Sequence, residues 1–446
     1  MNKEERKAFR VVEQQFTIRE AVAEAKRCLH CKKPLCVTGC PIGNHIPDFI
    51  HQLSLGNIGE AMNIISENSN LPAICGRVCP HEKQCEGHCI LNKKEAPIRI
   101  GKLESFIADF DADVQLTREK LVAKNRGKVA VIGSGPAGLT VAGVLARKGF
   151  HVTIFEGQEE PGGVLMYGIP QYRLPKAVVR KEIKRIEELG VDFVLNTFVG
   201  EKITVDDLFG HGYDAIFMGT GTALPMEMKG VPGTELHGVS QSSHFLHTVA
   251  AYNEGAISRY MVPLTQGDRV GIIGGGNVAM DAARTAIRMG AASVTVIYRR
   301  TQADMPAIEK EYNEAVNEGI QFYWETQAVE FVGDDNGKLK EVKLVSPEGE
   351  RMEAFDRVYL AIGSRPASRI VSTTEGIEVD EKGYVIVQDR PCGMTTRAGV
   401  FAGGDVVHRP QTVVMAMKAA QEVAKGIEQY VDAIKLMEDV GLIGNR

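Results

Sequence analysis

Eight of the chain's nine cysteines lie within its first 89 residues, in two closely spaced runs. The first run is Cys28-x2-Cys31-x4-Cys36-x3-Cys40, followed by Pro41. The second run is Cys75-x3-Cys79-x5-Cys85-x3-Cys89, with Pro80 after Cys79. A CxxC pair followed by further thiols and a Cys-Pro step is typical of ferredoxin-like loops that bind [4Fe-4S] clusters. Eight such thiols predict two clusters and therefore one-electron chemistry.

Structural zinc and disulfides are the alternative uses of such cysteines. Zinc favours four-ligand sets built from two CxxC pairs, often completed by His, and the two runs fit that pattern poorly. The segment Met1–Lys7 has no apolar stretch of the kind found in a secretory signal, so we expect a cytoplasmic protein with reduced thiols. His81 and His88 lie inside the second run, and we expect them to be polar loop residues.

Length and composition indicate a multidomain globular enzyme. A chain of 446 residues predicts two to four domains. It has no run of 18 apolar residues, so no membrane span is expected. The net charge of −5 argues against a nucleic-acid partner, which requires a basic face.

The elements that must position the cysteines differ from those of the rest of the chain. The first 125 residues lack β-alternation and predict short helices between cysteine loops. Thr17 and Glu20 have the spacing of a capping box, which predicts a helix leading into Cys28. A polar stretch, Leu121–Gly127, predicts a linker. Beyond it, short β-branched runs alternate with helical stretches, the pattern of parallel α/β sheets.

A dinucleotide-binding pattern follows the linker. The strand Val129–Ile132 enters a turn in which Gly133 allows the tight bend, Gly135 lets a pyrophosphate approach and Gly138 lets helix and strand pack closely. The next strand ends at Glu156, where a carboxylate would accept hydrogen bonds from ribose hydroxyls. The alternative, an ordinary glycine-rich βα turn, leaves the terminal acid unexplained.

The same pattern occurs a second time. The strand Val270–Ile273 leads into Gly274, Gly276 and Asn277, and the following strand ends in Arg299 and Arg300 instead of an acid. Guanidinium groups pair with a 2′-phosphate, so this site is predicted to prefer NADP(H) over NAD(H). The alternative is that the two arginines form a solvated surface pair. Two nucleotide sites in one chain indicate hydride transfer between two cofactors, so the first site is expected to hold FAD. The strand and Gly404-Asp405 step near the C-terminus are a recurring feature of flavin-binding folds.

The full length of the chain resembles the small (beta) subunit family of NADPH-dependent glutamate synthase. Similar proteins are the large subunit of NADH-dependent ferredoxin–NADP oxidoreductase and the N-terminal half of dihydropyrimidine dehydrogenase. The resemblance rests on the cysteine runs, the segment Pro161–Lys176 with Gly163, Gly274–Asp281 and Gly399–Asp405. It implies an α/β protein with a helical bis-[4Fe-4S] domain and two Rossmann-like domains, the NADPH domain being inserted in the FAD domain. The expected domains are 1–125 for the clusters, 126–235 and 366–446 for FAD, and 236–365 for NADP(H).

The resemblance also implies a set of cluster ligands. One cluster would be held by Cys28, Cys31, Cys36 and a non-cysteine ligand, expected at Glu104. The other would be held by Cys40, Cys79, Cys85 and Cys89. Cys75 is then left over. The alternative makes Cys75 a ligand and Glu104 an ordinary helix residue.

The function implied by the resemblance is NADPH oxidation with electron transfer through FAD and the clusters to a partner subunit. The leading partner is the glutamate synthase large subunit. The alternatives are a bifurcating NADH-dependent ferredoxin–NADP oxidoreductase and a dihydropyrimidine dehydrogenase. A redox sensor or scaffold with degenerate nucleotide folds is disfavoured by the intact glycines. Because cofactors carry this chemistry, no catalytic side chain is expected. Trp324 is expected to serve packing, and Cys392 has no assigned role.

Overall fold

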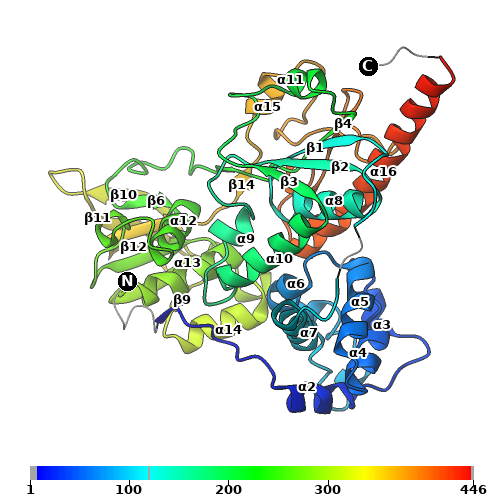
Figure 1. Ribbon diagram of the computed structural model, residues 1–446. Helices are drawn as coiled ribbons and strands as arrows, with labels where there is room; N and C mark the ends of the chain where they lie inside the picture. The colour runs from blue at the N-terminus through cyan, green and yellow to red at the C-terminus, as the bar shows by residue number, and fades with distance from the viewer. Residues whose placement is uncertain (1–7, 119–120, 443–446) are drawn as a thin grey trace. The chain divides into compact units, whose positions relative to one another are not determined.

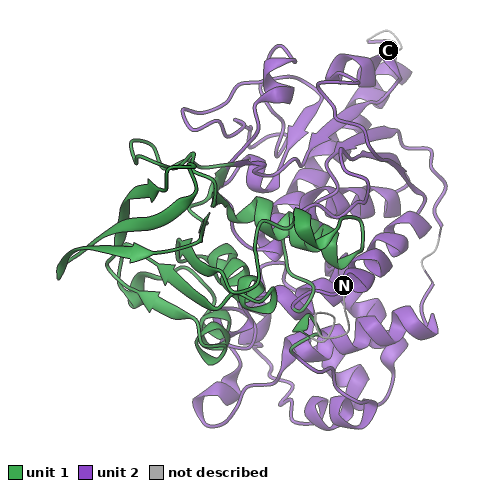
Figure 2. Ribbon diagram, turned by 90° about the vertical axis from the view of Figure 1, so that its left-hand side faces the viewer, with its two compact units in different colours: residues 1–12, 167–172, 225–364 green, residues 13–166, 173–224, 365–446 purple. Residues whose placement is uncertain are grey.

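The structure is a computed structural model that describes residues 8–118 and 121–442. The chain divides into two compact units, shown in different colours in Figure 2. The larger unit comprises residues 13–166, 173–224 and 365–442, and the smaller comprises residues 8–12, 167–172 and 225–364.

The larger unit begins with a helical region, blue in Figure 1, that has no strand in its described residues 13–118. Its helices are α2 (Ile18–Ala25), α3 (Leu35–Gly39), α4 (Ile46–Ser54), α5 (Ile58–Asn68), α6 (Pro72–Val78) and α7 (Ile100–Val114), with short 3₁₀ turns η1 (His81–Lys83) and η2 (Ile90–Lys93). The predicted capping box is confirmed, because Thr17 and Glu20 exchange hydrogen bonds at the start of α2. Buried apolar side chains such as Phe49, Met62 and Leu103 pack between these helices.

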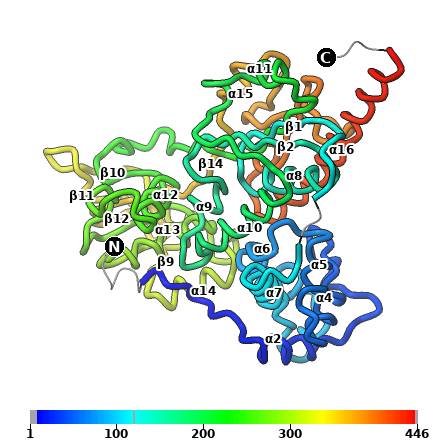
Figure 3. The backbone as a smooth tube through the Cα atoms, viewed as in Figure 1, coloured from blue at the N-terminus to red at the C-terminus, as the bar shows by residue number. Residues whose placement is uncertain are grey.

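The same unit contains a five-stranded parallel sheet in the order β15-β4-β1-β2-β3. The strands are β1 (Lys128–Ile132), β2 (His151–Phe155), β3 (Val191–Val194), β4 (Ala215–Met218) and β15 (Val400–Ala402). The covering helices include α8 (Pro136–Arg147), α10 (Lys176–Glu188) and the long α16 (Val413–Asp439). Figure 3 follows the chain as it returns, orange to red, to this sheet near residue 400. The predicted insertion of one dinucleotide fold within the other is confirmed by this return.

The smaller unit carries a second five-stranded parallel sheet, in the order β6-β13-β7-β8-β9. Its strands are β6 (Val239–Gln241), β7 (Arg269–Ile273), β8 (Ser293–Ile297), β9 (Gln321–Tyr323) and β13 (Arg357–Leu360). Helices α12 (Ser242–Asn253), α13 (Asn277–Arg288) and α14 (Glu309–Asn317) belong to it, as does an antiparallel sheet of β10 (Gln327–Gly333), β11 (Leu339–Ser346) and β12 (Gly349–Ala354).

The limits of this unit differ from the expected 236–365. It runs from Pro225 to Ser364 and also takes in residues 8–12 and 167–172. Tyr172 explains part of the difference, because its side chain is fully buried in the core of the smaller unit, in the same cluster as Phe9. The backbone N–H of Val12 donates to the carbonyl of Tyr172 at 3.2 Å.

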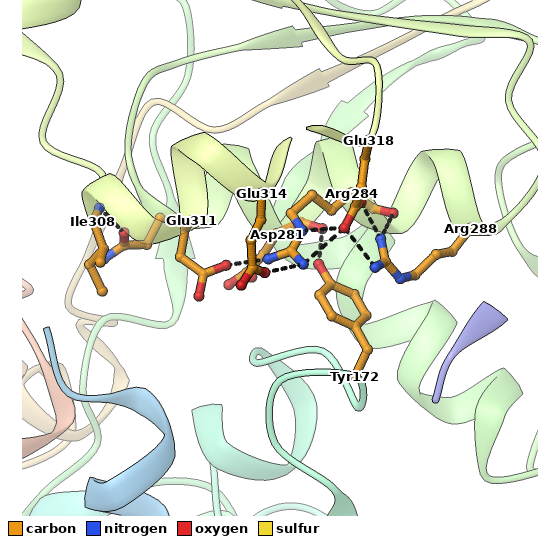
Figure 4. Close-up of polar contacts among 9 residues, drawn as sticks. Tyr172, Asp281, Arg284, Arg288, Ile308, Glu311, Glu314 and Glu318 are labelled. Carbon is orange, nitrogen blue, oxygen red and sulfur yellow. Dashed lines mark hydrogen bonds and ion pairs between the residues drawn. The ribbon is translucent and has the colours of Figure 1, made fainter. Parts of the chain in front are cut away.

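A charged network joins α13 to α14 and its C-terminal end (Figure 4). Arg284 is fully buried and forms ion pairs with Glu311, Glu314 and Glu318. Arg288 pairs with Glu318 at 2.5 Å, and its guanidinium lies 3.9 Å from the ring centroid of Tyr172. The network fixes the helix that follows the second glycine turn. Elsewhere in this unit Trp324 stacks on Phe322 with ring centroids 5.2 Å apart, in agreement with its expected packing role.

Among residues 8–118 and 121–442, no helix combines the length and apolar character needed to cross a membrane.

Candidate functional site: two thiol-lined cavities and two nucleotide turns

The first thiol-lined cavity lies in the helical region. Its lining contains the sulfur-bearing residues Cys28, Cys31, Cys36 and Cys89, together with apolar side chains from α4, η2 and the start of α7. Cys28 and Cys31 are in the loop after α2, Cys36 is in α3, and Cys89 precedes η2. We call it the first cavity.

The second cavity contains the other four thiols of the two runs, Cys40, Cys75, Cys79 and Cys85. Glu104 of α7, Asn44 and His81 also line it, and Val414 of α16 closes one side. Ile46 and Ile100 line both cavities. In the described part of the chain, no three His, Cys, Asp or Glu side chains are arranged to bind one metal ion. Each of the two cavities is lined by four thiols, a donor number that fits a [4Fe-4S] cluster.

The electrostatic neighbours of the thiols give the same grouping. Burial, together with the charges of Cys28, Cys89 and Cys31, raises the pKa of Cys36 to about 11. A hydrogen bond with Cys75 and burial raise the pKa of Cys79 well above its ordinary value. Burial raises the pKa of Cys40 to about 11, with additional contributions from the charges of Glu104 and Cys75. Thiols bind metals as thiolates, so iron binding here must displace protons.

Glu104 is the carboxyl group of the second cavity. It is 8% exposed, and Asn44 donates a hydrogen bond from Nδ2 to Oε1 at 3.2 Å. Burial and the nearby charge of Glu182 raise the pKa of Glu104 to about 8, although the Asn44 hydrogen bond acts in the opposite direction. This raised pKa favours the neutral form of the carboxyl group, which is a weaker metal ligand than the carboxylate.

This arrangement differs from the implied ligand grouping at three residues, Cys75, Cys89 and Glu104. Cys89 lines the first cavity, with Cys28, Cys31 and Cys36, and not the second. Glu104 lines the second cavity together with Cys75, and not the first. The reason lies in chain geometry. Cys89 begins the turn η2, whose Ile90 and Leu91 line the first cavity, whereas α6 presents Cys75 and Cys79 one turn apart on the other cavity.

The first glycine turn connects β1 to α8. Gly133 has φ 93°, and a Cβ there would lie 2.8 Å from the carbonyl oxygen of Gly219. A Cβ at Gly138 would lie 1.9 Å from the carbonyl oxygen of Gly133. A Cβ at Gly135, the N-cap of α8, would meet nothing within 4 Å. The space beside Gly135 at a helix N-terminus is suited to a pyrophosphate.

Glu156 follows β2 and is bound into this turn. Its Oε2 accepts hydrogen bonds from Ser134 N–H at 3.0 Å and Ser134 Oγ at 2.5 Å. Its Oε1 accepts from the N–H of Gln158 at 2.8 Å. The carboxylate thus organises the glycine turn itself, in addition to the predicted role toward ribose hydroxyls.

Two further predicted residues lie near the start of α8. A Cβ at Gly163, which has φ 53°, would be 3.0 Å from Cα of Gly135. A Cβ at Gly404, with φ 75°, would be 2.9 Å from Cβ of Ala137. Burial raises the pKa of the adjacent Asp405, while a backbone hydrogen bond with Gln411 lowers it. Gly163 and Gly404 therefore both lie against the first turn of α8, beside the space at Gly135.

The second glycine turn connects β7 to α13 in the smaller unit. Gly274 has φ 138°, and a Cβ there would lie 2.3 Å from the carbonyl oxygen of Ala361. Gly276 is the N-cap of α13 and has open space where a Cβ would be. Asn277 accepts a hydrogen bond at Oδ1 from the N–H of Ile308 at 2.8 Å, so its side chain holds the start of α14 against that of α13.

Arg299 and Arg300 follow β8, with Tyr298 between them and the strand. Both side chains are exposed, and the contacts found for the described residues include no ion pair for either. They are therefore available to an anionic group at the carboxyl end of the sheet.

Two residues near the cavities were not predicted as functional. Thr412 precedes α16 and has a buried hydroxyl without a hydrogen-bond partner. Met417 of α16 lies with Sδ 3.4 Å from Sγ of Cys75. A sequence pattern gives no signal for Met417, because its contact joins residues 342 positions apart. Cys392 is not among the residues that line the two cavities.

Comparison with protein-family models gives two matches. Residues 5–116 match the model described as dihydropyrimidine dehydrogenase domain II, 4Fe-4S cluster. Residues 127–420 match the model described as pyridine nucleotide-disulphide oxidoreductase.

Comparison with individual proteins gives relatives over almost the whole length. The chain is 37% identical to a glutamate synthase [NADPH] small chain of Halomonas elongata, over 96% of this chain and 94% of that protein. It is 35% identical to the NAD-dependent dihydropyrimidine dehydrogenase subunit PreT of Escherichia coli, over 94% of this chain and 96% of that one. Among solved structures, thioredoxin reductase of Lactococcus lactis matches with a TM-score of 0.53 and 27% identity, over 68% of this chain and 99% of that one.

Proposed function

Because the chain belongs to the glutamate synthase small-chain family and is an iron–sulfur flavoprotein oxidoreductase, we propose that it feeds electrons from NADPH to a partner subunit. The route runs through FAD at the first glycine turn and two [4Fe-4S] clusters in the thiol-lined cavities. We place it in the cytoplasm, where thiols stay reduced. The observation that carries the proposal is the presence of two four-thiol cavities in the same compact unit as the first glycine turn.

The residues of the nucleotide turns bind and orient the two cofactors. N–H groups at the starts of α8 and α13 face the spaces beside Gly135 and Gly276, where each pyrophosphate would lie. Arg299 and Arg300 would pair with the 2′-phosphate of NADPH and so select it over NADH. When bound, flavin converts the two-electron hydride chemistry of NADPH into single-electron steps.

For the cluster ligands we propose two sets of four cysteines. Cys28, Cys31, Cys36 and Cys89 form the first set, and Cys40, Cys75, Cys79 and Cys85 form the second. Glu104 is then a protonated neighbour of the second set. Both Cys75 and Glu104 line the second cavity, and the raised pKa of the buried Glu104 favours Cys75 as the fourth ligand.

The cysteine inventory supports an exit of electrons through the clusters. Cys392 is the only cysteine after residue 89, so the dinucleotide folds contain no pair of thiols for disulfide chemistry. The second cavity touches α16, the helix that begins eight residues after Gly404 and Asp405, through Val414 and Met417. Electrons leaving the flavin would therefore reach the second cavity before the first.

The leading partner is a glutamate synthase large subunit, in which glutamate would be formed. Residues 5–116 and 127–420 match the cluster and nucleotide modules, so the amidotransferase chemistry is assigned to the partner. The similarity to PreT favours a second candidate, electron input to a dihydropyrimidine dehydrogenase. A bifurcating NADH-dependent ferredoxin–NADP oxidoreductase is the third.

Anaerobic purification tests the proposal directly. We expect bound FAD, about eight irons per chain, and bleaching of the flavin by NADPH. A chain with zinc and no flavin would contradict it. A tagged chain pulled from its native cells, with mass spectrometry, then separates the partners: a large amidotransferase–FMN subunit identifies glutamate synthase, whereas a small flavin and [2Fe-2S] protein identifies the bifurcating enzyme.

A further inference from the structure

The two cavities differ in what lies next to them. The second cavity is lined by Val414, and Cys75 contacts Met417, so α16 of the first dinucleotide fold borders it. The first cavity is lined only by residues between Cys28 and Ile100. It therefore lies on the side of the cluster pair away from α16, and it is the cavity from which electrons would leave this unit.

The rim of the first cavity carries large apolar side chains in contact with solvent. Leu29 is 60% exposed, Leu35 is 48% exposed and Ile90 is 45% exposed, and all three line this cavity. We call these three residues the apolar rim. Single exposed leucines are ordinary on protein surfaces, but three around one redox cavity mark a contact surface.

Four lysines accompany the apolar rim. Lys32 and Lys33 lie between Cys31 and Leu35, and Lys93 and Lys94 end the turn η2 that begins with Ile90. All four are exposed, and the ion pairs and hydrogen bonds found for the described residues include none made by their side chains. Arg27 and Glu95 nearby are paired with each other, and Glu24 also pairs with Arg27. Unpaired positive charge thus gathers at this rim in a chain whose net charge is −5.

We propose that the apolar rim and these four lysines form the docking surface for an acidic, one-electron-accepting protein. The inference rests on the proposed function and adds the place and the charge of the partner. Complementary charge raises the rate of encounter, and an apolar centre excludes water where the two redox centres approach. Oxidation of each NADPH to NADP⁺ and H⁺ releases two electrons, so two encounters, each reducing one acceptor by one electron, follow each NADPH.

Kinetics with two haem proteins of opposite charge test the proposal. The acidic probe is the soluble domain of cytochrome b5, and the basic probe is cytochrome c. The test variant is Lys32→Glu, Lys33→Glu, Lys93→Glu and Lys94→Glu in one chain. The matched control makes the same charge change at four exposed lysines elsewhere, namely Lys184, Lys229, Lys340 and Lys382.

At low ionic strength the test variant should reduce cytochrome b5 at least about tenfold more slowly than the wild type does. The rate of the control variant should stay within about twofold of the wild-type rate. The difference should shrink at about 0.5 M salt, where charges are screened. The test variant should reduce the basic cytochrome c at least as fast as the wild type does. The proposal would be overturned if the rate of cytochrome b5 reduction fell equally in the test and control variants, or fell in neither.

Cross-linking gives a readout that does not depend on turnover. A zero-length carbodiimide reagent joins lysine amines to carboxylates in contact, and the oxidised wild-type chain mixed with cytochrome b5 should be linked at Lys32, Lys33, Lys93 or Lys94. Links confined to the control lysines would overturn the proposal. Iron content and flavin bleaching by NADPH check that each variant is folded and loaded. Failure of bleaching in the wild type would instead contradict the proposed function.

Discussion

Arg299 and Arg300 are the residues on which cofactor choice depends. They are exposed, and they occupy the position where the first dinucleotide fold has Glu156. Replacing both by alanine should raise KM for NADPH by about tenfold or more and change KM for NADH little, because only NADPH carries the 2′-phosphate. Steady-state kinetics with both nucleotides would measure this. A Lys338→Ala, Lys340→Ala variant in the same unit is the control, and a parallel rise in both KM values would refute the role.

Cys75 and Glu104 allow the ligand set to be tested. Cys75→Ser should lower the iron content from about eight to about four per chain and remove one cluster signal from the EPR spectrum. Glu104→Gln, which preserves shape and is neutral like the protonated acid, should retain both clusters. Cys392→Ser serves as the control for loss of a thiol. Iron loss in Glu104→Gln, together with full iron in Cys75→Ser, would restore the grouping implied by resemblance alone.

The sequence predicted the chemistry of the cysteines better than their grouping. Residue type and spacing were sufficient to indicate clusters, since CxxC and Cys-Pro steps are local features. Which thiols share a cavity depends on how α6, α7 and η2 fold over one another. For that reason Cys89 and Glu104 lie in different cavities from those expected.

At the scale of elements, two glycines of the first turn serve different purposes: Gly135 leaves space for FAD, and Gly138 lets the helix and strand pack. A Cβ at Gly135 meets nothing within 4 Å, whereas one at Gly138 would lie 1.9 Å from the carbonyl oxygen of Gly133. We therefore expect Gly135→Ala to fold with near wild-type iron content but to lose FAD. Gly138→Ala should misfold or lose much of its thermal stability. Flavin absorbance and melting curves distinguish these outcomes, and loss of folding in both variants would contradict the account of Gly135.

The charged network between α13 and the end of α14 makes the stability of the smaller unit depend on pH. Partial burial of Glu318 raises its pKa. Hydrogen bonds from Arg288 and Arg284, and the charges of these two arginines, lower the pKa by more than burial raises it, so the net shift is downward. A lowered pKa in the folded state stabilises the protein above the unfolded value near 4.5, and this stabilisation is lost as pH falls through the folded pKa.

Glu318→Gln should accordingly reduce the unfolding free energy at pH 7 by about 2 kcal/mol. The difference from wild type should narrow as pH falls below 4.5. Denaturant unfolding between pH 3 and 7, about the range in which carboxylates titrate, measures both effects. Glu309→Gln, on the same helix but exposed, is the control. If the difference in unfolding free energy between wild type and Glu318→Gln stayed constant across that range, the charge of Glu318 would not contribute to stability.

At the scale of the whole molecule, the sequence predicted two parallel sheets and the insertion of one fold within the other. Repeated strand, glycine turn and helix patterns carry that information locally. The segment 167–172 was assigned to the first fold by its neighbours in the chain, yet Tyr172 is buried in the smaller unit. No periodicity in six residues reveals which core they join.

The smaller unit should therefore depend on chain segments outside its main stretch. A fragment of residues 225–364 lacks Phe9 and Tyr172, whose rings pack in its core with Tyr172 against Arg288. We expect this fragment to melt at a lower temperature than the same unit in the full chain, as followed by the fluorescence of Trp324, the only tryptophan. Adding the peptide 167–172 should raise the melting temperature. Equal stability of fragment and full chain would show that these contacts contribute little.

The distribution of the thiols has a consequence for how the protein is made. Each cysteine run gives three thiols to one cavity and one thiol to the other, so Cys89 completes the first cavity and Cys40 completes the second. The second set of thiols is complete only once Cys85 has been synthesised, and the first only once Cys89 has been synthesised. Iron delivery must then follow synthesis of both cysteine runs, because each run supplies thiols to both cavities.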